Sequence, residues 1–374
     1  MLRFLTAGES HGPALTAIIE GLPAGLELEE EYIARDLHRR QEGYGRGGRM
    51  KIERDRAQIL GGVHQGRTTG APISLLIENK DWPNWKDKHV PVHTVPRPGH
   101  AELAGALKYG HEDMRIIAER ASARNTAMLV AVGAVARKLL QELGITIFSQ
   151  VMEIGGVQAR ETDLPLPELV HRLEASSLRC ADPEAEQAMR QLIDEARESG
   201  DTLGGVFEVH IIGVPTGLGS YAHWDRRLDG RLAQAIMSIM AIKGVEFGEG
   251  FHIAGMRGTE AHDELFIKDG KIVRDTNHAG GIEGGMSNGE PIVIRAAMKP
   301  IPTTIQPQRS VDTKTKLPAP TQYQRSDICA VPAAGVVAEA MSAWIIADTI
   351  VEKFGGDNLE AIKGNIATYQ HYGS

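Results

Sequence analysis

Several short segments of the chain are rich in apolar and β-branched residues, the composition of β-strands. They lie at residues 2–7, 16–20, 58–60, 73–78, 145–151 and 206–214. A further segment, 265–275, has Asp269-Gly270 near its centre, a dipeptide typical of a two-residue hairpin turn. The pattern therefore predicts many short strands, including at least one hairpin.

Two long segments are apolar on more than one face and predict buried helices. Residues 122–143 are apolar through their centre, and residues 331–354 are rich in alanine with few charges. Helices of this kind pack between layers and not on a surface. Residues 28–41 and 182–199 also predict helices, and the dense charge of the second indicates that it is solvated. Asp182 suits its N-cap, followed by proline at the first helical position.

The strands occur in runs and do not alternate strictly with helices, so a Rossmann-type fold is not indicated. We predict an α+β protein in which antiparallel sheets cover central helices. No repeat or long linker divides the chain, and 374 residues suit two or three domains or one large domain.

Composition narrows the class of protein. The 41 basic and 49 acidic side chains give a net charge of −8, unfavourable for non-specific nucleic-acid binding. Glycine is abundant, with 42 residues, which suits loops that approach a ligand closely. Two cysteines are too few for a disulfide framework. No signal peptide is visible, and the longest apolar run, 127–136, is shorter than the ~20 residues of a membrane span. We expect a cytoplasmic protein without a membrane segment.

Two motif matches point to chemistry that their surroundings do not support. Residues 8–12, GESHG, match the nucleophile elbow of serine hydrolases, but a strand-like segment follows where the elbow requires a helix. Residues 43–48 match the dinucleotide fingerprint G-x-G-x-x-G, but they follow a charged helix and not a strand. We also find no P-loop and no zinc motif, and we expect no metal.

A basic segment with interleaved glycines predicts a flexible anion-binding loop. Its cations are Arg35, Arg39, Arg40, Arg46, Arg49, Lys51, Arg54 and Arg56. A solvated charged face is the alternative, but such a face does not need flexible backbone. Guanidinium groups match carboxylate and phosphate geometry, so a small polyanionic substrate is indicated.

Two histidines lie in glycine-flanked loops and are candidates for general acid–base chemistry. His11 lies in the polar turn after the first strand, and His100 follows two prolines and a glycine. A structural role is the alternative for each, but histidine titrates near neutral pH and serves as acid or base. The start of the first buried helix, RASAR at 120–124, and the glycine-rich segment 278–289 are further candidate ligand-binding loops.

Six motifs in this order resemble the chorismate synthase family. They are GESHG, RPGHAELAGALKYG, RASARNTA, NHAGGIEGGMSNG, KPIPT and RSDICAVPAA, and they extend over residues 8 to about 345. The resemblance implies a single domain over residues 1–374, a β-α-β sandwich with central helices between antiparallel sheets, and a homotetramer. It implies conversion of 5-enolpyruvylshikimate 3-phosphate to chorismate by anti-1,4-elimination of phosphate. This reaction needs reduced FMN although no net redox change occurs.

The resemblance also implies roles for individual residues. His11 matches the histidine that protonates the leaving phosphate, and His100 the one that protonates or stabilises the reduced flavin. Asp327 matches the aspartate that assists proton removal through the flavin N5. The residues matching flavin contacts are Arg120, Ala121, Ser122, Met240, Ala241, Gly284, Lys299, Pro300, Ile301, Pro302, Thr303 and Arg325. Those matching the anion-binding set for substrate or NADP are Ser10, Arg40, Arg46 and Arg49.

The chain departs from the family pattern at two of these motifs. Many members have histidine where this chain has Ser326, next to the retained Asp327, and a polar residue where it has Met240. Since no dinucleotide fold is evident, we expect an external reductase to supply the reduced flavin, with NADPH acting at most as a reductant. A module that binds flavin or a phosphorylated metabolite without chemistry is the alternative function.

Overall fold

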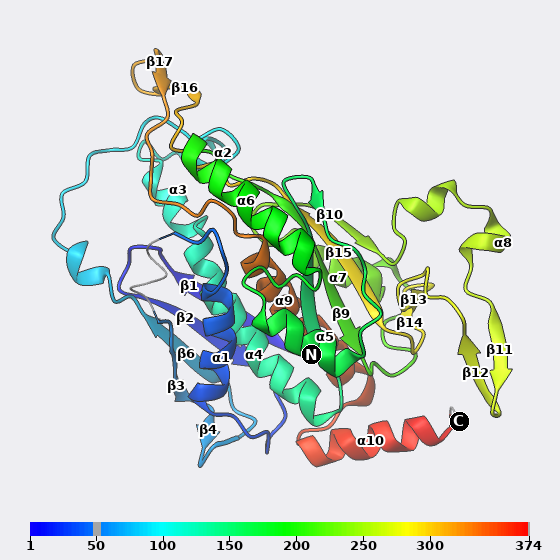
Figure 1. The fold of residues 1–374 in the computed structure, drawn as a ribbon. Helices are drawn as coiled ribbons and strands as arrows, with labels where there is room; N and C mark the ends of the chain where they lie inside the picture. The colour runs from blue at the N-terminus through cyan, green and yellow to red at the C-terminus, as the bar shows by residue number, and fades with distance from the viewer. Residues whose placement is uncertain (48–53, 373–374) are drawn as a thin grey trace.

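The computed structural model describes residues 1–47 and 54–372, and it combines helices with antiparallel sheets, the predicted α+β class (Figure 1). One sheet has four strands in the order β1-β2-β6-β3, formed by Arg3–Gly8, Ala14–Glu20, Ile73–Glu78 and Ala57–Gly61. All its neighbouring strands are antiparallel. The strand predictions for this sheet are confirmed to within a few residues.

The second sheet has five strands in the order β10-β15-β9-β7-β8. These strands are Ile242–Phe247, Ile292–Met298, Gly205–Ile212, Thr146–Ile154 and Val157–Gln158. β7 and β9 were predicted, whereas β10 and β15 were not. β15 nevertheless shows strict alternation, because its residues are alternately buried and half-buried along its length.

Two long helices pack on each other, and each of them packs against one of the two sheets. α4 (Thr126–Glu142) contacts β1 and β2, whereas α9 (Val331–Phe354) contacts β7 and β9. α9 is long and apolar enough for a membrane span, but 89% of that stretch is buried inside the protein. It is therefore a core helix, as its sequence predicted.

Shorter elements complete the described chain. Those that position the loops discussed below are α1 (Glu30–Gln41), α2 (Glu102–Tyr109), α3 (Arg115–Arg120), the 3-10 turns η2 (Trp82–Asn84) and η3 (Ala123–Asn125), and α7 (Leu228–Met237). The others are β4 (Val63–His64), β5 (Arg67–Thr68), α5 (Leu166–Ala175), α6 (Pro183–Ser199), η4 (Trp224–Arg226), η5 (His252–Gly255), α8 (Gly258–Ala261), β13 (Ile282–Glu283), β14 (Met286–Ser287), β16 (Arg309–Val311), β17 (Pro318–Pro320) and α10 (Leu359–Tyr372). Asp182 caps α6 by accepting hydrogen bonds from the N–H groups of Glu184 and Ala185, as predicted.

The predicted hairpin forms an arm that projects from the body of the molecule (Figure 1). β11 (Leu265–Lys268) and β12 (Lys271–Arg274) pair in register, and both turn residues, Asp269 and Gly270, have positive φ angles of 53° and 76°. Such angles at both positions are those of a type I′ turn, which the Asp-Gly dipeptide favours.

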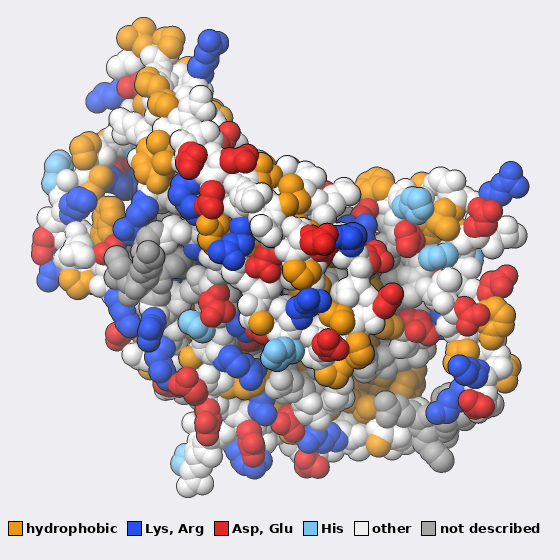
Figure 2. Space-filling view, viewed as in Figure 1, with side chains coloured by type: hydrophobic (Ala, Val, Ile, Leu, Met, Phe, Trp, Pro, Cys, Tyr) orange, Lys and Arg blue, Asp and Glu red, His pale blue; other side chains and the backbone are white. Residues whose placement is uncertain are grey.

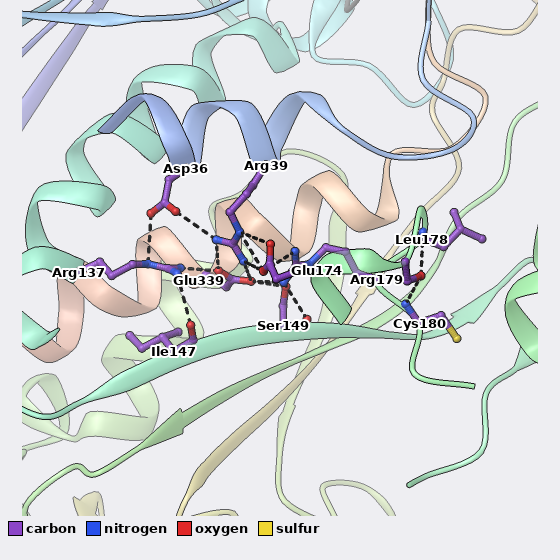
Figure 3. A network of polar contacts seen from close by, with 11 residues as sticks. Asp36, Arg39, Arg137, Ile147, Ser149, Glu174, Leu178, Arg179, Cys180 and Glu339 are labelled. Carbon is purple, nitrogen blue, oxygen red and sulfur yellow. Dashed lines mark hydrogen bonds and ion pairs between the residues drawn. The ribbon is translucent and has the colours of Figure 1, made fainter. Parts of the chain in front are cut away.

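A buried ion network links α1, α4 and α9 to β7 (Figure 3). The Glu339 carboxylate of α9 is fully buried and accepts hydrogen bonds from Arg39, Arg137 and Arg179, and from the Ser149 hydroxyl at 2.6 Å. Burial by itself would raise the pKa of Glu339, but the three arginines outweigh it and hold the pKa well below its usual range.

The closest approach of α4 and α9 lies at Gly133. A Cβ atom there would lie 2.3 Å from the Ala340 Cβ and 2.6 Å from the Ala340 carbonyl oxygen.

We expect Gly133→Ala to lower the melting temperature, because overpacking of a core costs about 1–3 kcal/mol and the gain in helix propensity is only about 1 kcal/mol. The matched control is Gly364→Ala in α10, where no atom lies within 4 Å of the added methyl group. A Gly133→Ala variant that melts at or above the wild-type temperature would contradict this account.

The buried network gives a second expectation. Glu339→Gln leaves three buried arginines without their common counter-charge, and loss of one partner of a buried ion pair costs about 3–5 kcal/mol. Thermal and urea unfolding at pH 7 measure the effect. Glu31→Gln is the control, because Glu31 forms an exposed ion pair with Arg56 and such pairs contribute about 0–1 kcal/mol. Equal stability of the two variants would show that the network is not stabilising.

Candidate active site

The first candidate loop connects β1 to β2. Gly8 ends β1 with a φ of 110°, and a Cβ atom there would lie 2.4 Å from the Ala14 carbonyl oxygen, so only glycine fits this tight exit. The Ser10 side chain is buried, and its Oγ lies 3.0 Å from the Ser122 Oγ. Because a second strand follows the loop, it is not a nucleophile elbow, in agreement with the sequence argument.

His11 is held by a carboxylate that sequence reasoning did not select. The His11 Nδ1 lies 2.6 Å from Glu119 Oε1, and its ring lies against Trp85 with the centroids 4.0 Å apart. The only sequence signal for Glu119 is its position immediately before the RASAR motif. The next residue, Arg120, donates hydrogen bonds from its guanidinium to the backbone oxygens of Thr6 and Gly8, which fixes α3 against β1.

A cluster of buried charges lies beside this loop at the N-terminus of α4. Asp55 accepts hydrogen bonds from Arg40 at 3.0 Å and from Arg124 at 2.5 Å, and Arg40 also donates to the Thr126 hydroxyl. Burial, together with the charges of Arg46 and Arg124, outweighs Asp55 and lowers the pKa of Arg40 to about 10. Asp55 was not selected from the sequence, because an acidic residue within a basic segment carries no motif.

The glycine-rich loop after α1 docks on the segment that contains Asp327. The Arg46 guanidinium lies 3.0 Å from Asp327 Oδ2, and the Gly47 N–H donates to Asp327 Oδ1 at 2.6 Å. The Gly45 carbonyl accepts a hydrogen bond from the Ile328 N–H at 2.9 Å. Arg49 lies outside the described residues.

The cations of the predicted anion-binding segment do not all face one site. Arg39 points into the Glu339 network, whereas the next residue, Arg40, reaches Asp55. Arg56 pairs with Glu31 at the surface. Arg56 thus fits the alternative of a solvated face, Arg39 has a structural role in the core, and anion binding by Arg40 and Arg46 stays a prediction.

His100 lies in a separate cluster built on the Glu102 carboxylate. This carboxylate is fully buried, accepts hydrogen bonds from Arg97, and lies 3.6 Å from the His100 Nδ1. Burial and the positive charges of Arg97 and Lys299 outweigh Glu102 and lower the pKa of His100 to about 4. For Glu102, burial would raise the pKa, but hydrogen bonds from His93 and Arg97 lower it to about 2.

Two of the five predicted cofactor segments meet near His100. The Lys299 ammonium donates to the Gly99 carbonyl, and the Lys299 N–H donates to the Ala241 carbonyl at 3.0 Å. Arg97 donates to the Thr303 hydroxyl at 2.9 Å. This contact network thus includes residues 240–241 and 299–303. Arg325 is exposed and precedes Ser326 and Asp327 in the chain.

Gly284 lies apart from this group. It occupies the turn between β13 and β14, and the neighbouring Gly281 packs against Ile292 at the start of β15. Lys299 follows the other end of β15, and a strand of seven residues spans about 23 Å. Gly284 and the segment 299–303 therefore lie towards opposite ends of β15 within one copy of the chain.

Comparison with known proteins identifies the class and then the family. The chain is 56% identical to the chorismate synthase of Desulforudis audaxviator over 99% of its length and 97% of the relative's. It is 55% identical to that of Trichlorobacter lovleyi over 98% of each protein. A crystal structure of a chorismate synthase superposes with a TM-score of 0.81 at 45% identity, covering 99% of this chain and 98% of the other.

These relatives are carbon–oxygen lyases, so the chain is an enzyme of that class. The family model for chorismate synthase matches residues 2–351. The chain belongs to the chorismate synthase family, whose members catalyse the last common step of the shikimate pathway. The family resemblance of the sequence motifs is confirmed.

The lowered pKa of His100 has a consequence for stability. Since the unfolded ring titrates near 6.5 and the folded ring near 4, the unfolded state binds more protons in this interval. The contribution of His100 to the free energy of unfolding is therefore fully present above about pH 6.5, and it is lost as the pH falls towards 4. We expect His100→Gln to reduce the loss of melting temperature between pH 6.5 and 4.5. The exposed His64→Gln serves as control, and a His100→Gln profile identical to wild type would contradict the assignment.

Proposed function

We propose that the chain converts 5-enolpyruvylshikimate 3-phosphate to chorismate and phosphate, with reduced FMN as its cofactor. The observation that carries the proposal is the meeting of two groups at the start of α4. Ser122 there contacts Ser10, next to His11, while Arg124 shares Asp55 with Arg40. Ser122 and Arg124 thus link the loop of a candidate proton donor and a pair of buried guanidinium groups to the same short stretch of chain.

The charge of the substrate suits these residues. It carries two carboxylates and a phosphate, which guanidinium groups bind with two parallel hydrogen bonds. The Nε of Arg40 is buried without a hydrogen-bond partner among residues 1–47 and 54–372. We assign Ser10, Arg40, Arg46 and Arg49 to anion binding, His11 to protonation of the departing phosphate, and Asp327 to removal of the C6 proton.

The cluster around His100 fits a flavin. The buried His100 Nδ1 has no hydrogen-bond partner within the described chain, and Lys299 supplies a positive charge beside it. Ala241 adopts a positive φ of 70°, which brings its carbonyl to Lys299. The residues that would hold the flavin are Arg120, Ala121, Ser122, Met240, Ala241, Gly284, Lys299, Pro300, Ile301, Pro302, Thr303 and Arg325. When bound, the reduced flavin would supply a transiently donated electron without net redox change.

We further propose that the whole chain is one domain with the β-α-β sandwich of its family, acting as a homotetramer. One hydrophobic core that includes residues of both sheets, α4 and α9 supports the single domain. The β11–β12 arm supports assembly, because its apolar side chains are exposed, among them Ile267 at 74% and Ile272 at 68% (Figure 2). The position of Gly284, towards the other end of β15 from residues 299–303, also supports assembly, because a neighbouring copy would bring this residue to the flavin.

The cellular setting follows from the same reasoning. We propose a cytoplasmic enzyme that acts on a small molecule and binds neither nucleic acid nor membrane, and whose flavin is reduced by a separate reductase. The loop after α1 follows a helix, so it lacks the strand–turn–helix context in which dinucleotide-binding glycines hold a pyrophosphate. NADPH with oxidised FMN would then give no turnover unless a reductase is added.

The test is an anaerobic assay with photoreduced FMN and 5-enolpyruvylshikimate 3-phosphate. We expect chorismate and phosphate to form in equal amounts, and neither to form with oxidised FMN alone. We expect His11→Ala and His100→Ala to lower turnover by at least about tenfold, as expected for general acid–base groups, with flavin still bound. His64→Ala, on exposed β4, is the control.

Three outcomes would contradict the proposal. Folded protein that binds FMN but forms no product under reducing conditions would favour the module that binds without chemistry. Wild-type turnover in both His11→Ala and His100→Ala would show that these residues are not the acid–base groups. Labelling of Ser10 by a fluorophosphonate would support the serine-hydrolase interpretation of the GESHG motif. We expect no such labelling.

A further inference from the structure

Glu119 contacts His11 through both of its carboxylate oxygens. Oε1 lies 2.6 Å from the His11 ring Nδ1, and Oε2 accepts a hydrogen bond from the His11 backbone N–H at 2.7 Å. The Glu119 main-chain oxygen also accepts from the Ser10 N–H at 3.2 Å. One residue of α3 therefore fixes both the backbone and the ring of the histidine on the β1–β2 loop.

The position of Glu119 is itself fixed by its surroundings. The side chain of Asn125 donates to the carbonyls of Glu119 and Arg120, at 3.2 and 2.6 Å. The guanidinium of Arg120 is bound to Thr6 and Gly8 of β1. The carboxylate is only 15% exposed, so it is held on a rigid turn between β1 and α4.

The contact defines the tautomer of the histidine. An ionised carboxylate only accepts hydrogen bonds, so Nδ1 must carry a hydrogen and Nε2 is the ring atom that gains and loses a proton. Trp85 covers one face of the ring, with centroids 4.0 Å apart. Within residues 1–47 and 54–372, no hydrogen bond occupies Nε2.

We propose that Glu119 is a positioning residue that fixes the orientation and tautomer of His11, so that Nε2 delivers the proton to the leaving phosphate. This inference rests on the proposed function. In this step the C3–O bond breaks and its electron pair leaves with the phosphate oxygen, which takes the proton from Nε2. Overall, the C6–H electron pair forms the C1–C6 double bond and the C1–C2 double bond shifts to C2–C3. The His11 ring becomes neutral and retains the Nδ1 hydrogen that Glu119 accepts, while the C6 proton leaves to a separate base.

The kinetic test compares Glu119→Gln and Glu119→Asp with wild type in the anaerobic assay. An amide cannot accept from both N–H groups through two oxygens, so we expect Glu119→Gln to lower kcat about 10- to 100-fold with KM changed less than about threefold. Glu119→Asp keeps both acceptors on a shorter stem and should recover part of the loss. The matched control is Glu112→Gln, an exposed glutamate that precedes α3, which should match wild type.

A double variant separates positioning from a general structural role. If Glu119 acts only through His11, then His11→Gln combined with Glu119→Gln should be no slower than His11→Gln alone. Losses that multiply in the double variant would overturn the inference. Wild-type kcat in Glu119→Gln, with His11→Gln impaired, would also overturn it.

Nitrogen NMR of protein labelled in its histidine rings tests the tautomer without any turnover. We expect wild type at pH 8 to show a His11 resonance of the Nδ1–H form, assigned by its absence from His11→Gln, and Glu119→Gln to shift towards the Nε2–H form. An Nε2–H form in wild type would overturn the inference. Absence of chorismate from wild type would instead contradict the proposed function, and the NMR result would still decide whether Glu119 sets the tautomer.

Discussion

The burial of the Glu339 carboxylate among three arginines is the constraint on which the rest of the structure depends. Through Arg39, the Glu339 network fixes α1 against α4 and α9. The next residue of α1, Arg40, pairs with Asp55, which also binds Arg124 just before α4. Neighbouring side chains on a helix point about 100° apart, so the network that anchors Arg39 also sets the direction of Arg40. A charge cluster in the core thereby sets the direction of Arg40, a candidate anion-binding residue.

Features that depend on local sequence were predictable. The helix of residues 331–354 and the hairpin at Asp269-Gly270 were predicted because helix burial and turn geometry follow from a few adjacent residues. β10 and β15 were missed; β15 alternates in burial but not in sequence, because every residue of IVIRAAM except Arg295 is apolar. Strand order is set by contacts between distant segments, which no local pattern specifies.

The site shows the same division between local and distant information. His11 and Arg40 were selected as candidates because they lie in a motif and in the basic segment, whereas the carboxylates that hold them were not selected. Glu119 and Asp55 are ordinary acidic residues whose importance comes only from folding, since each lies opposite a group from a distant part of the chain. A carboxylate that orients another side chain needs no motif, only the correct position.

The two histidines differ in the charges that face them, and this difference suits different roles. His100 lies beside Arg97 and Lys299, which disfavour an additional positive charge, so its ring remains neutral near pH 7. His11 lies against the Glu119 carboxylate, which contacts Nδ1 and leaves Nε2 as the ring atom for the proposed proton transfer. A neutral ring at His100 can still donate one hydrogen bond and accept another, which suits contact with a ligand. Arg97 and Lys299 face one ring and Glu119 faces the other, so one fold places its two candidate histidines in surroundings of opposite charge.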